Sequence, residues 1–169
     1  MFARMLGTRS RRLAGAAALA IAVLGSALAP QSATAAGLPD LMLGLGAPAS
    51  VPRNSTVKFQ VKLHNDGSGA SKQPSVLGTL HRNFQITSVK ADDPTFKCSF
   101  VNDDFVFGEI WGCGGTRGLA SQGTVVVTVI AKTPSTAGSH SLQHMADPNN
   151  VEAESNEGNN QLSQPIQVQ

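Results

Sequence analysis

A strict two-residue alternation between Thr56 and His64 is the feature that most limits what this chain can fold into. Successive side chains of a β-strand point to opposite faces, so this period places every apolar group on one buried face and every polar group in water. A helix of 3.6 residues per turn would scatter the same residues around its axis. The apolar set is Val57, Phe59, Val61 and Leu63, and the polar set is Lys58, Gln60, Lys62 and His64.

Further segments predict strands, separated by turns rich in Gly, Pro, Asn and Asp. The β-branched run Thr124–Ile130 is expected to be central and covered on both faces. Thr95–Val101 and Phe105–Trp111 predict a hairpin that turns at Asn102–Asp104. No amphipathic helix follows residue 36, so the fold class is all-β, an antiparallel Ig-like β-sandwich of about seven to nine strands. The other expected strands are Asp40–Gly46 at an edge, one or two within Val76–Val89, Ser139–Ala146 and Gln161–Val168, with residues 47–54 as a loop.

Residues 1–36 have the pattern of a secretory signal peptide: a basic start, an apolar middle and small residues at the exit. The apolar run Leu13–Ala29 is shorter than the roughly 20 residues that a membrane span needs. We therefore expect residues 1–36 to be removed and residues 37–169 to form one domain without a membrane span. That domain would be secreted, and extracellular or periplasmic.

Removal of the signal peptide would change the charge of the protein. The formal net charge is +2, and residues 1–36 carry four positive charges and no negative one, so +2 less 4 leaves −2. The remaining charges are scattered singly along the chain. Without a basic stripe to bind phosphates, the sequence argues against nucleic acid as a partner.

The two cysteines, Cys98 and Cys113, predict a disulfide, because an even count in an exported chain favours pairing. Free buried thiols are the alternative, and the spacing suits neither a zinc site nor a cysteine nucleophile. We expect the disulfide to join a strand to the loop that follows the hairpin, with Trp111 packed nearby. Gly112–Gly123 is expected to be that glycine-rich loop, and Arg117 is a binding candidate in it.

The stretch Met145–Asn160 is rich in Asp, Asn, Glu and Gly and admits two interpretations. Asp and Asn side chains bond nearby backbone, so an ordered turn between the last two strands is the favoured one. Alternatively, Asp147, Glu154 and Glu157 bind Ca²⁺ together with backbone oxygens, although the spacing does not fit an EF-hand loop. Apart from this possible Ca²⁺, we expect no cofactor.

The sequence does not predict an enzyme. His140 and His144 lie on one face of a predicted strand and are expected to face solvent, and no third ligand completes a zinc site with them. No motif frames a nucleophile and a base. Gly112–Gly118 lacks the Lys-Ser/Thr of a phosphate-binding loop.

Four motifs together resemble the CARDB family, the cell adhesion related domain found in bacteria. They are Pro39-Asp40-Leu41, Asn65-x-Gly67, Ala137-Gly138 and Asp147-Pro-x-Asn-x-Val-x-x-Glu154-x-x-Glu157-x-Asn159-Asn160. The middle is also similar to related surface-repeat modules, through Cys98, Cys113 and Leu119-Ala-Ser-Gln-Gly123. The resemblance implies an Ig-like β-sandwich of exported bacterial and archaeal proteins, with no catalytic residues.

Two functions follow from this reading. The first is a secreted, non-catalytic Ig-like module that binds an extracellular protein or a glycan, as a monomer or weak oligomer. Its contacts would lie in Gly112–Gly123 and Asp147–Asn160. The alternative is a structural envelope subunit that assembles through exposed edge strands, Asp40–Gly46 or Gln161–Gln169. The binding-loop candidates are Arg117, Asn149, Asn156 and Asn159.

Overall fold

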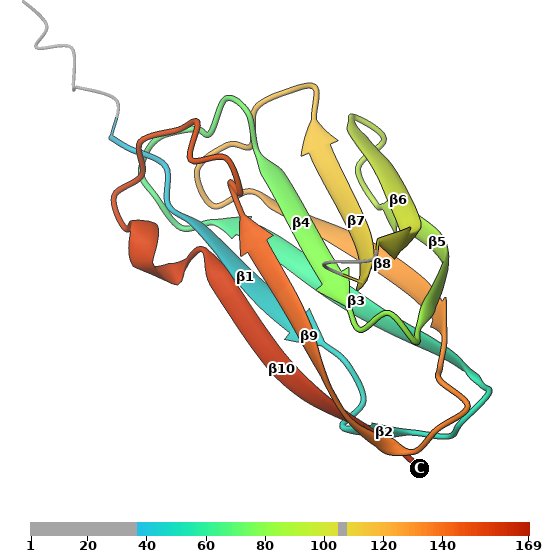
Figure 1. The fold of residues 1–169 in the computed structure, drawn as a ribbon. Helices are drawn as coiled ribbons and strands as arrows, with labels where there is room; N and C mark the ends of the chain where they lie inside the picture. Colours follow the sequence, from blue (N-terminus) through green and yellow to red (C-terminus); the bar gives the residue numbers. More distant parts are fainter. Residues whose placement is uncertain (1–36, 105–107) are drawn as a thin grey trace, which may run out of the picture. The chain divides into compact units, whose positions relative to one another are not determined.

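Two packed β-sheets form the domain, and the fold class expected from the sequence is confirmed (Figure 1). The computed structural model describes residues 37–104 and 108–169, so the predicted signal peptide lies outside the described residues. The strands are β1 (Leu41–Gly46), β2 (Ser50–Val51), β3 (Thr56–Asn65), β4 (Ser75–Leu80), β5 (Gln85–Ala91), β6 (Phe96–Asp104), β7 (Gly108–Gly115), β8 (Thr124–Lys132), β9 (Gly138–Ala146) and β10 (Gln161–Val168), with a 3₁₀ helix η1 (Glu157–Asn159) before β10.

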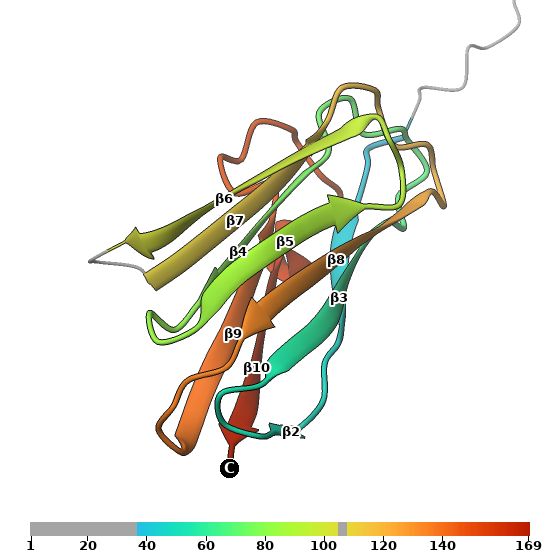
Figure 2. The same cartoon turned by 90° about the vertical axis from the view of Figure 1, so that its right-hand side faces the viewer.

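The four-stranded sheet has the order β1-β3-β8-β5, and the six-stranded sheet has the order β2-β10-β9-β4-β7-β6 (Figures 1 and 2). Every pair is antiparallel except β2 with β10. The ten strands exceed the expected number, partly because residues 50 and 51, expected in a loop, pair with β10. β1 is an edge strand as expected. β10 pairs with β9 along its whole length, and on its other side β2 pairs only with Gln167 and Val168, so residues 161–166 lie at the edge of the six-stranded sheet, as expected.

The alternation in β3 is confirmed, since its apolar residues are all buried between the sheets. The prediction for Thr124–Ile130 is only half right. β8 is central, between β3 and β5, but Val126 and Ile130 face outward and are half-buried while Val125, Val127 and Val129 are buried. No described layer covers that outer face, so the β-branched composition reflects pairing with two neighbours rather than burial on both sides.

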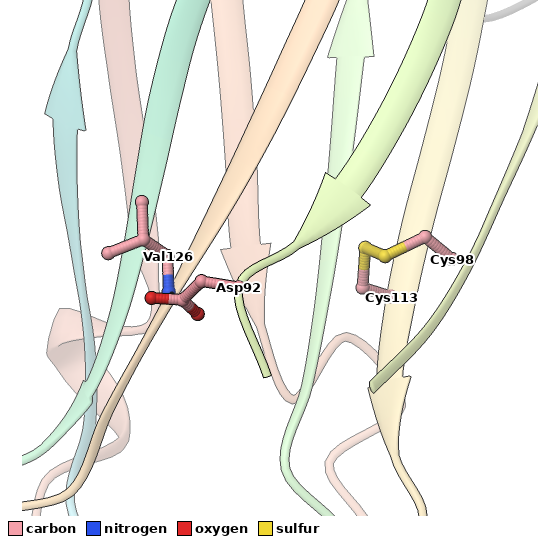
Figure 3. Close-up of a disulfide and its surroundings, with 4 residues drawn as sticks. All are labelled: Asp92, Cys98, Cys113 and Val126. Atoms are coloured by element: carbon pink, nitrogen blue, oxygen red, sulfur yellow. A yellow bond between two sulfur atoms is a disulfide. The ribbon is translucent and has the colours of Figure 1, made fainter. Parts of the chain in front are cut away.

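The disulfide lies within the hairpin of β6 and β7, so its expected position, between a strand and a loop, is wrong. Cys98 and Cys113 are bonded, as predicted, but they lie directly opposite each other in the two strands, so the bond crosslinks neighbouring strands and reaches no loop (Figure 3). Asn102–Asp104 belongs to β6 and is not the turn; the connection, residues 105–107, lies outside the described residues. Gly112–Gly115, expected in a loop, completes β7.

Trp111 is fully buried on the same inward face of β7 as Cys113, as expected for an aromatic residue near the disulfide. Its indole lies over Gly78 of the neighbouring strand β4. A Cβ atom on Gly78 would lie 2.2 Å from Trp111 Cε2, so only glycine leaves room for the ring. Phe59 closes the core from the opposite sheet.

Asn65, at the end of β3, is fully buried and joins three segments through one side chain. Its Oδ1 accepts the backbone N–H groups of Asp40 (3.0 Å) and Gly67 (3.1 Å). Its Nδ2 donates to the carbonyl oxygens of Gly69, Leu119 and Ala120, at 2.8, 3.0 and 3.1 Å. The motifs around Asp40, Asn65 and Leu119 therefore meet at one point, although they are far apart in sequence.

We expect Gly78→Ala to lower the free energy of unfolding by about 1–3 kcal/mol, because the added methyl group overpacks the core against Trp111. Gly114→Ala is the matched control in the adjacent strand, since its Cβ would meet nothing within 4 Å. Urea unfolding of both variants with the disulfide intact measures the difference. Equal stability of the two variants would contradict the packing of Trp111 on Gly78.

Asn65→Asp should lower the free energy of unfolding by about 3 kcal/mol or more, because a buried carboxylate would face three carbonyl oxygens that now accept from the Asn65 amide. Asn54→Asp makes the same chemical change at an exposed turn residue with φ 51°, which Asp tolerates. We expect that control to stay within about 0.5 kcal/mol of the original protein. Thermal and urea unfolding measure both values.

Candidate functional site

Residues 147–160, here called the acidic clasp, connect β9 to β10 and hold the start of β1 (Figure 1). The Glu154 carboxylate accepts the backbone N–H of Leu41, and the Ser155 N–H donates to the Pro39 carbonyl at 2.8 Å. Asn159 Nδ2 donates to Asp40 Oδ1 at 2.7 Å. The clasp is therefore an ordered connection, which agrees with the favoured interpretation of this stretch.

Hydrogen bonds inside the clasp hold the carboxylates of Glu154 and Glu157 close together. The Glu154 N–H donates to Glu157 Oε1 at 2.9 Å, and Asn160 Nδ2 donates to Glu154 Oε1 at 3.1 Å and to Glu157 Oε2 at 3.2 Å. Asp147, whose φ is 36°, accepts the Glu152 N–H on Oδ2 at 2.9 Å. Burial raises the pKa of Glu154, and the nearby carboxylates of Glu157 and Asp147 act in the same direction.

The three predicted Ca²⁺ ligands thus lie near one another, but they do not form a ready-made metal cage. Among residues 37–104 and 108–169, no group of three or more His, Cys, Asp or Glu side chains is arranged to hold a metal ion. Ca²⁺ binding by Asp147, Glu154 and Glu157 stays a prediction. In the same described ranges, no helix has the length and apolar character needed to cross a membrane.

Three of the binding-loop candidates lie in the clasp, and Arg117 lies in the connection between β7 and β8. Asn149 and Asn156 are exposed in the clasp, where Asn156 Oδ1 accepts the Gly158 N–H at 3.1 Å and caps η1. Asn159 is bonded to Asp40. Arg117 is exposed after β7, near Asp93, whose pKa is lowered mainly by hydrogen bonds from Thr95 and to a smaller extent by the Arg117 charge.

The expectation that His140 and His144 face solvent is wrong. They do share one face of β9, but it is the inward face, because Leu142 between them is a core residue. His144 is 1% exposed, with its ring 5.6 Å from the Trp111 ring and 6.0 Å from the Phe59 ring. His140 is half-buried and packs against the rings of His81 and Phe84.

Burial without a hydrogen-bond partner on either ring nitrogen lowers the pKa of His144 to about 4. A histidine in the unfolded chain has a pKa of about 6.5, so the unfolded state binds a proton first as the pH falls. The stability that depends on neutral His144 is therefore complete above pH 6.5 and is lost as the pH falls from about 6.5 towards 4.

Between pH 7 and pH 4.5 this linkage should lower the free energy of unfolding by about 2–3 kcal/mol. His144→Leu keeps an apolar group of similar size in the core and removes the titrating ring. Between pH 7 and pH 4.5, we expect the free energy of unfolding of the variant to fall by about 2–3 kcal/mol less than that of the original protein. Urea unfolding at both pH values measures the difference. Parallel losses in the two proteins would contradict the burial of neutral His144.

A groove of about 890 Å³ on the outer face of the six-stranded sheet was not expected from the sequence. Two cross-strand rows line it, Leu77–Met145–Gln161 and Ile110–Thr79–Gln143–Ser163, where neighbours in each row are paired residues of β7, β4, β9 and β10. We call this surface the outer groove. The sequence contains one sign of the groove. Leu77, Ile110 and Met145 are apolar although they alternate with the buried residues of their strands and therefore face outward.

The fold is similar to that of solved domains. The CARDB domain of a Pyrococcus furiosus protein, solved in complex with di-metal ions, aligns with a TM-score of 0.56 and 19% identity over 78% of this chain and 90% of that domain. A cohesin module of a Clostridium perfringens family 33 glycoside hydrolase aligns with a TM-score of 0.52 and 9% identity over 78% of this chain and 97% of that module. At these identities the likeness concerns the fold alone.

No curated protein matches the chain in sequence. The CARDB family model matches residues 38–164, which include all four motifs noted in the sequence. Asp40, Asn65, Glu154 and Asn159 from those motifs are joined by the hydrogen bonds that hold β1. The match spans nearly all of the sandwich, and the chain therefore belongs to the CARDB family.

Proposed function

We propose that this protein is an extracellular, non-catalytic binding module that holds a protein partner on the outer groove. The observation that carries the proposal is the charge of that face. None of the outward-facing residues of β4, β7, β9 and β10 is charged, whereas the outer face of the other sheet carries Lys58, Lys62 and Lys132. Depletion of charged residues is the compositional signal at the core of a protein interface.

The chemistry of the outer groove favours a protein over a charged polymer. Its centre is aliphatic, with Leu77, Ile110 and Met145 half-buried, and methionine is enriched in interfaces. Around that centre, Gln143 and Gln161 can each donate and accept hydrogen bonds. An anionic glycan or a nucleic acid would need cations here, and the groove lining contains none.

Export of the protein is supported by the pattern of residues 1–36 and by the disulfide, since disulfides persist in oxidising compartments outside the cytosol. The loops first considered as contacts are less suitable. Gly112–Gly115 is strand, and Glu154 and Asn159 of the clasp are engaged with β1. We therefore assign binding to the sheet face rather than to these loops.

Gln143→Arg should abolish partner capture without unfolding the domain, because Gln143 is exposed in the middle of the outer groove. Gln60→Arg introduces the same charge at an exposed position on the outer face of β3 and serves as the matched control. The purified proteins would be immobilised and compared for capture from the envelope and culture fractions of the source cells. Capture lost in the first variant and kept in the second supports the proposal, and equal capture by both overturns it.

A further inference from the structure

The acidic clasp concentrates negative charge without a cationic side chain to balance it. Among the described residues, no lysine or arginine side chain makes an ion pair with a clasp carboxylate. The hydrogen bonds to Glu154 and Glu157 come from backbone N–H groups and from the Asn160 amide. Neutral donors compensate a carboxylate only in part, and closely spaced carboxylates repel one another.

The clasp also contains more oxygen acceptors than donors. Asn160 is 8% exposed and its amide points at the Glu154 and Glu157 carboxylates, yet its Oδ1 has no hydrogen-bond partner. Asp147 is 4% exposed and its Oδ1 is likewise buried without a partner. Buried polar atoms are nearly always satisfied in folded proteins, so each of these oxygens needs an explanation. A cation bound beside the Asn160 amide would supply one for the Asn160 oxygen.

The distances in the clasp suit a hard cation. Asn160 Nδ2 is 3.1 Å from Glu154 Oε1 and 3.2 Å from Glu157 Oε2. Ca²⁺ binds oxygens at about 2.3–2.6 Å, so two oxygens on neighbouring positions of its shell lie about 3 Å apart. A half-turn of the Asn160 amide would place Oδ1 where Nδ2 now lies, at that spacing from one oxygen of Glu154 and one oxygen of Glu157. We propose that Glu154, Glu157 and Asn160 form a Ca²⁺ site in the acidic clasp.

Such a site would stabilise the attachment of β1. Glu154 accepts the Leu41 N–H and Asn159 donates to Asp40, so a cation on Glu154 and Glu157 would hold the β9–β10 connection against the first strand. Two carboxylates and one amide, completed by water, make a weak site in the range of about 10⁻⁴–10⁻³ M found in extracellular modules. Mg²⁺ requires a stricter octahedral shell, and we expect it to bind more weakly.

Thermal unfolding with the metal alone tests the site. The purified protein should show a midpoint about 3–6 °C higher in 10 mM Ca²⁺ than in a chelator, because only the folded state assembles the site. Glu157→Gln keeps an acceptor for the Glu154 N–H and removes the charge, so it should lose the shift. Glu152→Gln is the matched control in the same clasp, since Glu152 instead accepts the N–H groups of Lys72 and Gln73 and should keep the shift.

Calorimetric titration with Ca²⁺ below the unfolding temperature gives a second readout that does not depend on how stable each variant is. Asn160→Asp adds a third carboxylate and should bind Ca²⁺ about tenfold more tightly than the original protein. Saturable binding that Glu157→Gln abolishes and Asn160→Asp strengthens supports the site. The absence of a Ca²⁺ response in the original protein, an equal response to Mg²⁺, or an undiminished response in Glu157→Gln overturns it.

Discussion

The structure depends on satisfying the backbone of Pro39–Leu41, where the chain enters the sandwich. Buried N–H and C=O groups must find partners, and this segment lies ahead of most of the β1–β3 ladder. Asn65 accepts the N–H of Asp40, the Glu154 carboxylate accepts that of Leu41, and the Ser155 N–H reaches the Pro39 carbonyl. Two segments separated by about half of the chain thus fix the first strand, which explains why the family motifs include polar residues at both places.

The core contains a buried polar side chain that, unlike the backbone of Pro39–Leu41, has no hydrogen-bond partner. Trp111, Phe59 and His144 fill its centre, and Gly78 leaves the space that the indole needs. His144 has no partner for either ring nitrogen and stays neutral only because burial lowers its pKa to about 4. The core therefore contains a group whose protonation favours unfolding, which couples stability to pH.

The two outer faces of the sandwich are chemically different although the strands have the same geometry. Lysines make the outer face of β3 and β8 charged and hydrophilic, while the outer groove is aliphatic at its centre and uncharged throughout its lining. A fold of this kind supports many functions, and only the surface distinguishes them. Binding on the groove and a cation in the clasp use different residues, so neither proposal depends on the other.

The sequence by itself determined the all-β class, the strand β3, the pairing of Cys98 with Cys113 and the family, because periodicity and motif spacing are local properties. It did not determine which residues face each other across strands. Register is set by pairing between distant segments. In addition, the alternation of residues along a strand does not show which of its two faces is buried. That is why the disulfide crosslinks β6 and β7 directly, why Gly112–Gly115 is strand, and why His144 lies inside. The outer groove likewise exists only because tertiary pairing sets Leu77 beside Met145 and Thr79 beside Ile110.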